Sequence, residues 1–265
     1  KEILPAIIRW TKKKDYPFSF STEASINLAD DKKLMELMVE AGFNKVFIGI
    51  ETPNEESLKE CRKFQNQNRD LMSCIKKIQN HGMEVQGGFI VGFDNDTPSI
   101  FNRQIKFIQR SGIVTAMVGL LNALPKTELY QRLKKSNRLL NISSGDNTDS
   151  SLNFLPKMDR ETLIRGYKRI LRTIYSPKYY YERVRTFLKE YPLPKRIGEV
   201  RVYKYHLDAF FRSIWELGIK GKERFYYWKL FFWCLLKRPY SFPLAITLSI
   251  HGLHFRKVFN QFLKE

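Results

Sequence analysis

Cysteine is scarce in this sequence. The 265 residues include only Cys61, Cys74 and Cys234, and no two of them are close in the chain. So few and so scattered cysteines exclude a disulfide framework and favour a reducing, cytoplasmic location. They also exclude a zinc ribbon or a cysteine-held iron–sulfur cluster built by these residues alone, so we predict no metal ligands. Fourteen glycines and eleven prolines are too few for a collagen-like or linker-like chain.

Long apolar runs and several well-known motifs are also absent. The two most apolar late stretches, 225–236 and 242–255, are interrupted by Lys229 and by two histidines. Both fall short of the roughly 20 residues needed to span a bilayer. No P-loop, nucleophile elbow or HExxH motif supports a nucleotide hydrolase, esterase or metalloprotease. Residues 1–10 contain no secretory signal and resemble the middle of a helix without an initiator Met, so we expect a piece of a longer protein.

Positive charge is abundant and uneven along the chain. The net charge is +19; residues 1–150 contain 22 Lys/Arg and 18 Asp/Glu, whereas residues 151–265 contain 24 and 9. This asymmetry predicts a boundary in composition and a separate anionic partner for the second half. Nucleic acid, an anionic lipid surface or an acidic protein would all fit, and so would a basic surface that is simply solvated.

The first half alternates short apolar runs with amphipathic segments. The runs are bounded by turn residues and are too short for helices, which predicts strands at 16–25, 45–52, 84–93 and 115–124. Apolar residues at helical spacing predict helices at 30–41, 69–80, 98–110 and 128–139. This alternation indicates βαβ units and a parallel sheet. A doubly wound sheet and a partial (β/α) barrel are both compatible with it.

In either architecture, ligands bind at the carboxyl ends of the strands. Two of the predicted strands carry a carboxylate near that end, Glu23 and Glu51. Gly87, Gly88 and Gly92 would let a ligand approach the backbone closely. The alternative is that the carboxylates cap neighbouring helices and the glycines form a bulge.

These strand ends, taken in order, resemble the second part of the core of radical S-adenosylmethionine (SAM) enzymes, in the cobalamin-binding subgroup. The segments that carry the resemblance are FSFSTEASINLADD (18–31), AGFNKVFIGIETPNEESL (41–58), KFQN (63–66), EVQGGFIVGFDNDTPSIF (84–101) and GIVTAMVGLLNALPKTELYQRL (112–133). The rest of the chain resembles the uncharacterised helical domain that follows this core in the branch with hopanoid C-2 methylase-like proteins. The resemblance implies an α/β fold: strands three to six of a partial (β/α)6 TIM-like barrel at 1–141, then a mostly α-helical domain at 142–265.

The resemblance also implies cofactors and a site. In the family, a CxxxCxxC loop holds a four-iron four-sulfur cluster, SAM binds its open iron, and SAM is cleaved to a 5′-deoxyadenosyl radical. That loop, the first two strands and the cobalamin-binding domain are not in this chain, so the cluster ligands and the cobalamin site are expected outside it. Matching positions imply nine SAM-contacting residues: Glu23, Glu51, Thr52, Gly88, Ile90, Gly92, Leu121, Asn122 and Ala123.

The implied function is that of a radical SAM enzyme, with a reductant for its cluster, that C-methylates an apolar or lipid-like small molecule with the help of cobalamin. Two residues depart from the family pattern: Lys126 replaces the usual Gly in the PKT loop, and Ser25 stands where many relatives have Arg. The alternative is a catalytically inactive, truncated protein whose basic, aromatic helical domain binds an anionic membrane or a partner.

After residue 141 the alternation of strands and helices stops. A polar loop at 143–151 precedes predicted helices at 160–176, 179–191, 198–218, 222–237 and 244–263, the later ones rich in aromatic residues. Aromatics beside Lys and Arg are typical of surface helices that face an anionic bilayer. A packed helical core is the commoner explanation. Nucleic-acid binding is the least favoured of the three, because the aromatics recur at helical, core-like spacing.

Overall fold

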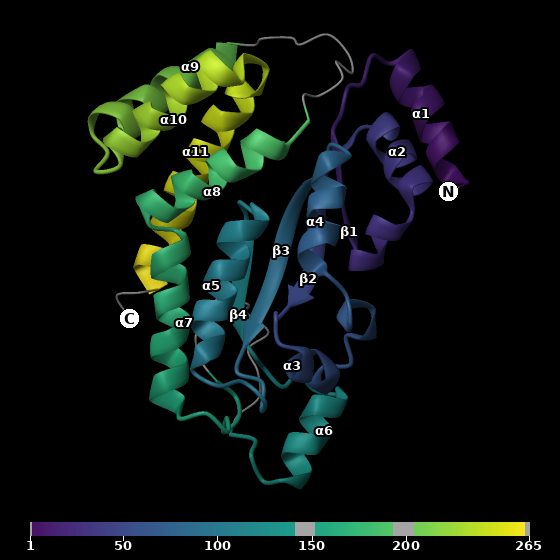
Figure 1. The fold of residues 1–265 in the computed structure, drawn as a ribbon, viewed down its shortest axis with the longest axis vertical. Coiled ribbons are helices and arrows are strands. Elements are labelled where there is room, and N and C mark those ends of the chain that lie inside the picture. Colours follow the sequence, from purple (N-terminus) through teal and green to yellow (C-terminus); the bar gives the residue numbers. More distant parts are fainter. Residues whose placement is uncertain (1, 141–151, 193–203, 263–265) are drawn as a thin grey trace.

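The computed structural model describes residues 2–140, 152–192 and 204–262. Figure 1 shows a β-sheet flanked by helices, with a further group of helices at one end. The strands are β1 (Phe20–Ala24), β2 (Phe43–Glu51), β3 (Glu84–Val91) and β4 (Ala116–Leu120). The helices of this part are α1 (Ile3–Lys13), α2 (Lys32–Ala41), α3 (Glu55–Glu60), α4 (Leu71–Asn80), α5 (Ser99–Ser111) and α6 (Glu128–Lys135), with short 3₁₀ turns at Ile26–Asp30 and Phe64–Asn66.

All four strands are parallel and lie in the order β1-β2-β3-β4. Each strand pairs with its neighbour in the chain, so the order never reverses as it does in a doubly wound sheet. Consecutive parallel strands with helical crossovers are the arrangement of a (β/α) barrel. The structure therefore confirms the predicted partial barrel and decides against the doubly wound alternative. Within the described ranges β1 and β4 do not pair with each other, so the arc of strands is open.

Two predicted strands are too long. The strand predicted at 16–25 begins only at Phe20, because the chain turns first: Asp15 and Tyr16 have φ angles of 55° and 49°. The strand predicted at 115–124 ends at Leu120. Beyond it, the N–H of Leu121 still bonds to the carbonyl of Val91 at the end of β3, but Ala123 bonds to the side chain of Asn153 far along the sequence.

Helix ends follow local capping signals. Asp31 precedes α2 and its carboxylate accepts a hydrogen bond from the N–H of Leu34 at 2.9 Å; Asp70 caps α4 in the same way. Gly42 and Gly112 end α2 and α5 with φ angles of 100° and 71°, in the left-handed region that favours glycine.

The helix predicted at 128–139 is wrong at its carboxyl end. α6 stops at Lys135, and Asn137 has a φ angle of 53°, which a helix does not tolerate. Leu139 then forms an isolated antiparallel bridge with Phe154. This bridge joins the chain just before residue 140 to the chain just after residue 151.

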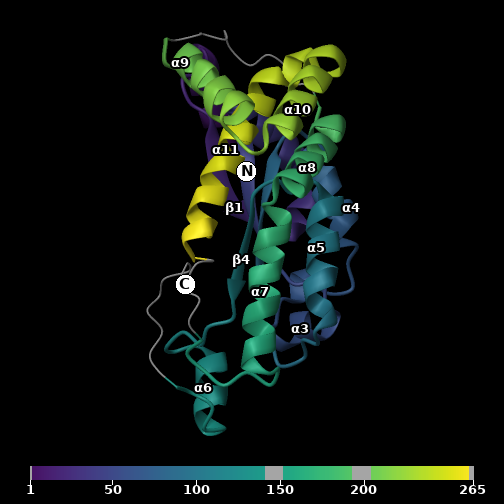
Figure 2. The ribbon, with the colours of Figure 1, turned by 90° about the vertical axis from the view of Figure 1, so that its left-hand side faces the viewer.

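The two faces of the sheet differ in cover. On one face, strand residues such as Val46, Ile48 and Val85 are fully buried, and Figure 2 shows α4, α5 and α7 on that side. The other face is more open: Met117 of β4 is 52% exposed there. The alternation of buried and accessible residues along β2, β3 and β4 places Gly49, Gly88, Gly119, Glu51 and Ile90 on this open face, whereas Gly87 lies on the covered face.

The second half of the chain is helical, as predicted. Its helices are α7 (Arg160–Ile174), α8 (Pro177–Glu190), α9 (Lys204–Ser213), a π-helical turn (Ile214–Ile219), α10 (Arg224–Lys237) and α11 (Phe242–Phe262). The loop predicted at 143–151 and the start of the helix predicted at 198–218 lie outside the described residues. No helix in the described ranges is both long enough and apolar enough to cross a membrane.

A buried arginine joins the two halves. Arg183 of α8 is fully buried and donates hydrogen bonds to the carbonyl of Ile174 at 2.8 Å, to that of Val114 at 3.2 Å, and to the side chain of Gln109. Its guanidinium lies 5.4 Å from the ring centroid of Tyr180. Burial lowers the pKa of Arg183. These contacts, together with the continuous buried cluster, fix the helical part rigidly against the barrel.

Candidate functional site at the carboxyl ends of the strands

The end of β2 contains a bulge that reorients Glu51. Gly49 pairs with Gly88 and Glu51 with Phe89, so one residue of β2 is left without a partner. Glu51 has a φ angle of 65°, in the left-handed region that residues other than glycine rarely adopt. Bulges often redirect side chains next to active sites. Such a strained conformation persists only where the surroundings enforce it.

The KFQN segment enforces this conformation from one side. Lys63 Nζ donates a hydrogen bond to Glu51 Oε1 at 2.8 Å. Asn66 is fully buried, and its Nδ2 donates to the carbonyls of Gly49 at 3.1 Å and Ile50 at 3.0 Å. The first contact orients the carboxylate and the second supplies partners to carbonyls that the bulge removes from the regular ladder.

Helix α5 supports the bulge from the covered face of the sheet. Gln104 is fully buried, and its Nε2 donates to the carbonyl of Ile90 at 2.8 Å and to that of Glu51 at 3.4 Å. One amide therefore ties the ends of β2 and β3 together. The backbone geometry at Glu51 thus depends on side chains 12 and 53 residues further along the chain.

Beside Glu51 the open face has glycines on three adjacent strands. Gly49 of β2 pairs with Gly88 of β3, and Ile90 of β3 pairs with Gly119 of β4. No heavy atom lies within 4 Å of the position that a Cβ would take at Gly119. The Glu51–Lys63 pair lies against Gly49 and the ring of Phe47 lies against Gly88, so the free space in front of the backbone is at Gly119. A planar ring could stack on the backbone there.

The turn after β3 is held by a buried carboxylate. Asp96 Oδ2 accepts hydrogen bonds from the N–H groups of Gly92 at 2.9 Å and Phe93 at 3.1 Å, and Oδ1 accepts from Ser57 Oγ at 2.8 Å. Burial raises the pKa of Asp96, although these hydrogen bonds act in the opposite direction. Gly92 has a φ angle of 109°, which requires glycine.

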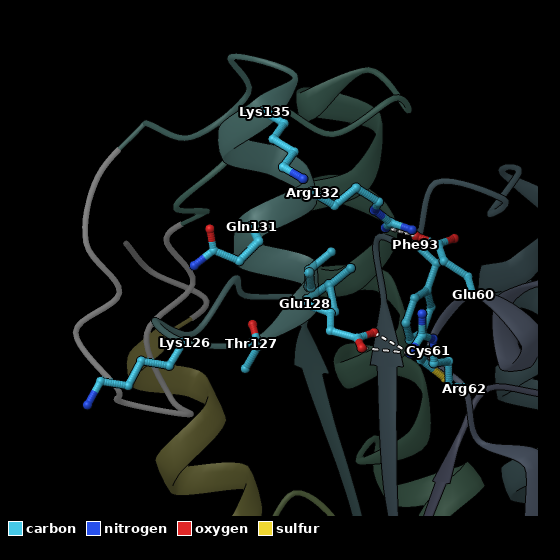
Figure 3. A pocket seen from close by; sticks show the side chains of 12 residues that line it. Glu60, Cys61, Arg62, Phe93, Lys126, Thr127, Glu128, Gln131, Arg132 and Lys135 are labelled. Atoms are coloured by element: carbon cyan, nitrogen blue, oxygen red, sulfur yellow. Dashed lines mark hydrogen bonds and ion pairs between the residues drawn. The ribbon is translucent and has the colours of Figure 1, made fainter.

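A cavity of about 720 Å³ opens where β3 and β4 end (Figure 3). Phe93 and Leu121, which follow these strands, give it apolar lining. The end of α3 and the region of α6 supply a mostly charged lining: Glu60, Arg62, Lys126, Glu128, Arg132 and Lys135. The volume lies within the roughly 300–1,000 Å³ of small-molecule sites.

Ion pairs connect the walls of this cavity, as the dashed lines in Figure 3 indicate. Arg62 lies 2.7 Å from the Glu128 carboxylate, and Arg132 lies 2.6 Å from Glu60 Oε1. Both pairs join the end of α3, or the turn that follows it, to α6. The cavity therefore has a connected, predominantly basic border above an apolar base.

A second ion pair anchors the segment after α6. Asp94 accepts two hydrogen bonds from Arg138, at 2.7 Å and 2.9 Å. Burial would raise the pKa of Asp94, but the hydrogen bonds and charge of Arg138, with Lys157 and Arg132, outweigh it and hold this pKa below its ordinary value. The carboxylate is thus already satisfied by protein partners, which assigns it a structural role beside the cavity.

Four of the nine predicted SAM-contacting residues share the open face of the sheet: Glu23, Glu51, Gly88 and Ile90. Glu23 is accessible but pairs with Phe47, four residues before Glu51. At about 3.3 Å per residue, the two carboxylates are on the order of 13 Å apart along the sheet. The structure therefore groups Glu51, Gly88 and Ile90, and it places Glu23 on the same face but further toward the amino ends of the strands.

The other five predicted residues lie in the turns that follow the strands. Leu121 lines the cavity and Gly92 forms the turn described above. Thr52 and Ala123 are fully buried, and the Thr52 hydroxyl accepts a hydrogen bond from the N–H two residues on. Asn122 is half-buried. Contact of all nine residues with SAM stays a prediction.

Sequence reasoning assigned no role to several residues of this site. Lys63 and Asn66 lie in the KFQN segment, which the resemblance included without a function. Gln104 had a detectable signal: it is a polar residue on the apolar face of α5, midway between Ile100 and Ile108 at a spacing of four. Such a position predicts a buried polar group with a partner to satisfy.

The open face fits SAM. The backbone at Gly119 has free space for a planar ring such as adenine, and the Glu51 carboxylate can accept hydrogen bonds from hydroxyl or ammonium groups next to it. The described residues do not fit an iron–sulfur cluster, since nowhere among them do three His, Cys, Asp or Glu side chains gather as metal ligands would. Cys74 lies in α4 and Cys234 lies in α10, and neither helix contains a residue of the bulge.

Two protein families match the chain. Residues 2–108 match the Radical SAM superfamily, and residues 127–265 match a Domain of unknown function (DUF4070). The first match includes the bulge, the KFQN segment and strand β3 with Gly88 and Ile90. The second begins at the residue that caps α6 and includes α7 to α11.

Named relatives agree with these matches. An uncharacterized methyltransferase of Synechocystis is 38% identical over 96% of this chain and 48% of its own length. The hopanoid C-2 methylase of Rhodopseudomonas palustris is 29% identical over 95% of the chain and 48% of its own length. The bacteriochlorophyllide d C-12(1)-methyltransferase of Chlorobaculum tepidum is 25% identical over 59% of the chain and 34% of its own length.

The chain thus spans about half the length of the first two relatives. The order of strands, the bulge beside the glycines of the open face and the two family matches agree with one another. The chain belongs to the radical SAM superfamily, in the methylase branch whose core is followed by this helical domain of unknown function.

Proposed function

We propose that this chain provides SAM-binding residues and the C-terminal domain of a radical SAM methyltransferase that methylates carbon on an apolar, lipid-like small molecule, with cobalamin as methyl carrier. The observation that carries the proposal is the enforced bulge at Glu51, on the same face of the sheet as the uncovered backbone at Gly119. The names of the relatives support methyl transfer, since they include a methylase of hopanoids and methyltransferases of a chlorophyll-type pigment.

In this proposal the residues of the chain bind and orient. Gly119 lets the adenine ring of SAM lie against the backbone, next to the Phe47 ring that covers Gly88. Glu51, held by Lys63, accepts hydrogen bonds from the ribose or the amino group. The cluster, its reductant and cobalamin, all held by residues outside those described, would supply the radical and methyl-carrier chemistry.

The cavity between α3 and α6 is the proposed place of the substrate. Its apolar base at Phe93 and Leu121 suits a hydrocarbon skeleton, and its basic border suits a polar or anionic end group. A substrate of this kind is found in or near membranes, so the proposal includes peripheral contact of the protein with an anionic bilayer.

Titration of the chain with SAM tests the binding site. Gly119→Val adds a branched side chain in free space, which strands tolerate, so the fold should survive while the ring loses its surface. We expect the dissociation constant for SAM to rise about tenfold or more, equivalent to at least 1.4 kcal/mol. Met117→Val, on the same face of β4, is the matched control. Native affinity in Gly119→Val would contradict the proposed site.

A methyl-transfer assay tests the reaction. The chain is fused behind the upstream half of the Synechocystis relative and incubated with methyl-labelled SAM, a reductant and a polycyclic lipid extract, with and without cobalamin. Label in the lipid that requires cobalamin supports the proposal. Cleavage of SAM without label in any lipid contradicts methyl transfer, and SAM binding without cleavage would favour the alternative of an inactive protein.

A further inference from the structure

The outer face of α9 and of the π-helical turn is apolar. Leu207, Phe211, Trp215 and Ile219 follow one another at intervals of four residues, which places them on one side of the helix. Each of the four is about half exposed or more. Large apolar side chains in such a row are costly in water and mark interaction sites when they are contiguous.

Helix α10 has a second row of this kind. Phe225, Phe232 and Leu236 are 68%, 54% and 76% exposed, and Lys229 lies between them in the same row. The opposite side of α10 is packed, with Tyr227 fully buried. The aromatic residues of this helix are therefore divided between the core and an exposed face, which the two sequence-based explanations treated as alternatives.

Trp228 connects the two rows. Its ring is stacked with that of Phe232 at a centroid distance of 5.6 Å, and its Nε1 donates a hydrogen bond to the carbonyl of Gly218 at 3.0 Å. The segment 204–219 and α10 thus pack together as a hairpin, and we call the exposed apolar residues of its two rows the aromatic hairpin surface: Leu207, Phe211, Trp215, Ile219, Phe225, Phe232 and Leu236.

The hairpin is also basic. Residues 204–240 contain eight Lys/Arg and three Asp/Glu. Of the acidic residues, Glu223 is buried against Arg256 at 2.6 Å and Glu216 lies 3.6 Å from Lys220. The charge that remains around the aromatic hairpin surface is therefore positive.

We propose that the aromatic hairpin surface docks the protein on an anionic lipid bilayer. Lys229 decides between a bilayer and a protein partner. At the centre of a protein interface its ammonium would be desolvated, and lysine is depleted there. At a bilayer surface its long stem can lie among apolar groups while the ammonium reaches the phosphates. Aromatic residues flanked by Lys and Arg on an exposed helix are the usual composition of an interfacial element.

The position of the hairpin determines how the protein would sit on the membrane. Figure 1 shows α9 and α10 at one end of the molecule and α3 and α6, which border the cavity, at the other. Docking through the hairpin leaves the cavity and the Glu51 bulge uncovered. This inference makes the membrane contact of the proposed function specific, but binding to vesicles can be measured whether or not that function is correct.

Co-sedimentation of the chain with vesicles tests the proposal. With phosphatidylglycerol–phosphatidylcholine vesicles at low salt we expect binding that weakens steeply as salt screens the charges. The triple substitution Phe225→Ser, Phe232→Ser and Leu236→Ser should lower the partition coefficient by about tenfold or more. Its matched control, Ile3→Ser with Phe18→Ser and Leu155→Ser, removes side chains of similar exposure elsewhere and should bind like the native chain.

Further measurements separate the possible outcomes. Lys229→Glu should weaken binding to anionic vesicles more than to pure phosphatidylcholine, and the triple variant should keep native SAM affinity and native circular dichroism. Native vesicle binding by the triple variant would overturn the proposal. So would a native chain that sediments as a dimer without binding vesicles while the triple variant is monomeric, because the surface would then be an interface between two copies.

Discussion

The side chain of Asn153 bonds both backbone groups of Ala123. The N–H of Ala123 donates to Asn153 Oδ1 at 2.9 Å, and Asn153 Nδ2 donates to the Ala123 carbonyl at 2.8 Å. Both residues are buried. One amide therefore replaces the strand partner that this segment lacks, and it explains why β4 ends at Leu120 instead of continuing as predicted.

Asn153→Ala should destabilise the chain because it leaves a buried N–H and a buried carbonyl without partners. An unsatisfied buried group costs about 1–3 kcal/mol, so we expect a loss of about 2–4 kcal/mol in the free energy of unfolding. Urea denaturation followed by circular dichroism measures it. Asn80→Ala, at the exposed end of α4, should change stability by less than about 0.5 kcal/mol. Equal stability of Asn153→Ala and the native chain would show that these hydrogen bonds contribute nothing.

Lys63→Met should weaken SAM binding, because it removes the ammonium that orients the proposed SAM-contacting carboxylate of Glu51. A hydrogen bond to a charged group contributes about 1.5–3 kcal/mol, so a rise of about tenfold in the dissociation constant is expected by calorimetry. Lys63→Arg should recover part of the affinity. Lys59→Met, which removes an exposed partner of Glu56, is the control. If Glu51→Gln loses affinity while Lys63→Met keeps it, Lys63 does not position Glu51.

Glu84 should make the chain less stable as the pH rises. Its side chain is buried and Oε1 has no hydrogen-bond partner among the described residues, and burial raises the pKa of Glu84 while Lys45 and Gln86 partly oppose the rise. Below the ordinary carboxyl pKa, Glu84 is protonated in both the folded and the unfolded chain, so it does not change the free energy of unfolding. Above that pH the unfolded chain releases the proton while the folded chain still holds it. The free energy of unfolding therefore falls as the pH rises through the folded pKa.

The amide variant Glu84→Gln removes this loss. Its melting temperature should exceed that of the native chain at about pH 7, and the difference should vanish near about pH 4, close to the ordinary carboxyl pKa. Glu36→Gln, exposed on α2, should show no comparable pH-dependent gain. A constant difference between Glu84→Gln and the native chain across this range would contradict the role of ionisation.

Gly166 lets α7 approach α5 closely. A Cβ at this position would overlap the ring of Phe101, so Gly166→Ala should cost about 1–3 kcal/mol by overpacking, reduced by the roughly 1 kcal/mol that alanine gains in a helix. With Phe101→Leu in the background, the overlap is relieved and the same substitution should become neutral or stabilising. Thermal unfolding of the native chain, the two single variants and the double variant gives the double-mutant cycle. The same sign in both backgrounds would show that Phe101 is not the obstacle.

The sequence contained most of the information about the elements. Short apolar runs bounded by turn residues predicted four strands, and apolar residues at helical spacing predicted the helices between them. Asp31, Gly42 and Gly112, which stand at helix ends in the structure, are residue types that mark such ends in a sequence. These signals are local: the period and the cap depend on residues within one or two turns. The six-residue helix α3 was not predicted, because it is too short to show a period.

The site was predictable only in part. The strand ends pointed to Glu23, Glu51 and the glycines at 88 and 92, because parallel strands bring their carboxyl ends to one edge, and the family resemblance added Ile90. Pairing in the sheet then separated Glu23 from Glu51, since a register is a relation between two strands and cannot be read from either one alone.

What the sequence by itself determined was the alternation of elements, their caps, the family motifs and the basic, aromatic character of the second half. Only the tertiary structure decided that β2 bulges at Glu51 and that Lys63 and Gln104 enforce the bulge. It also decided which aromatic residues of α10 are core and which are exposed. The physical reason is common to both: strain at one residue and burial at another depend on atoms that distant segments bring within contact, and spacing along the chain does not encode that contact.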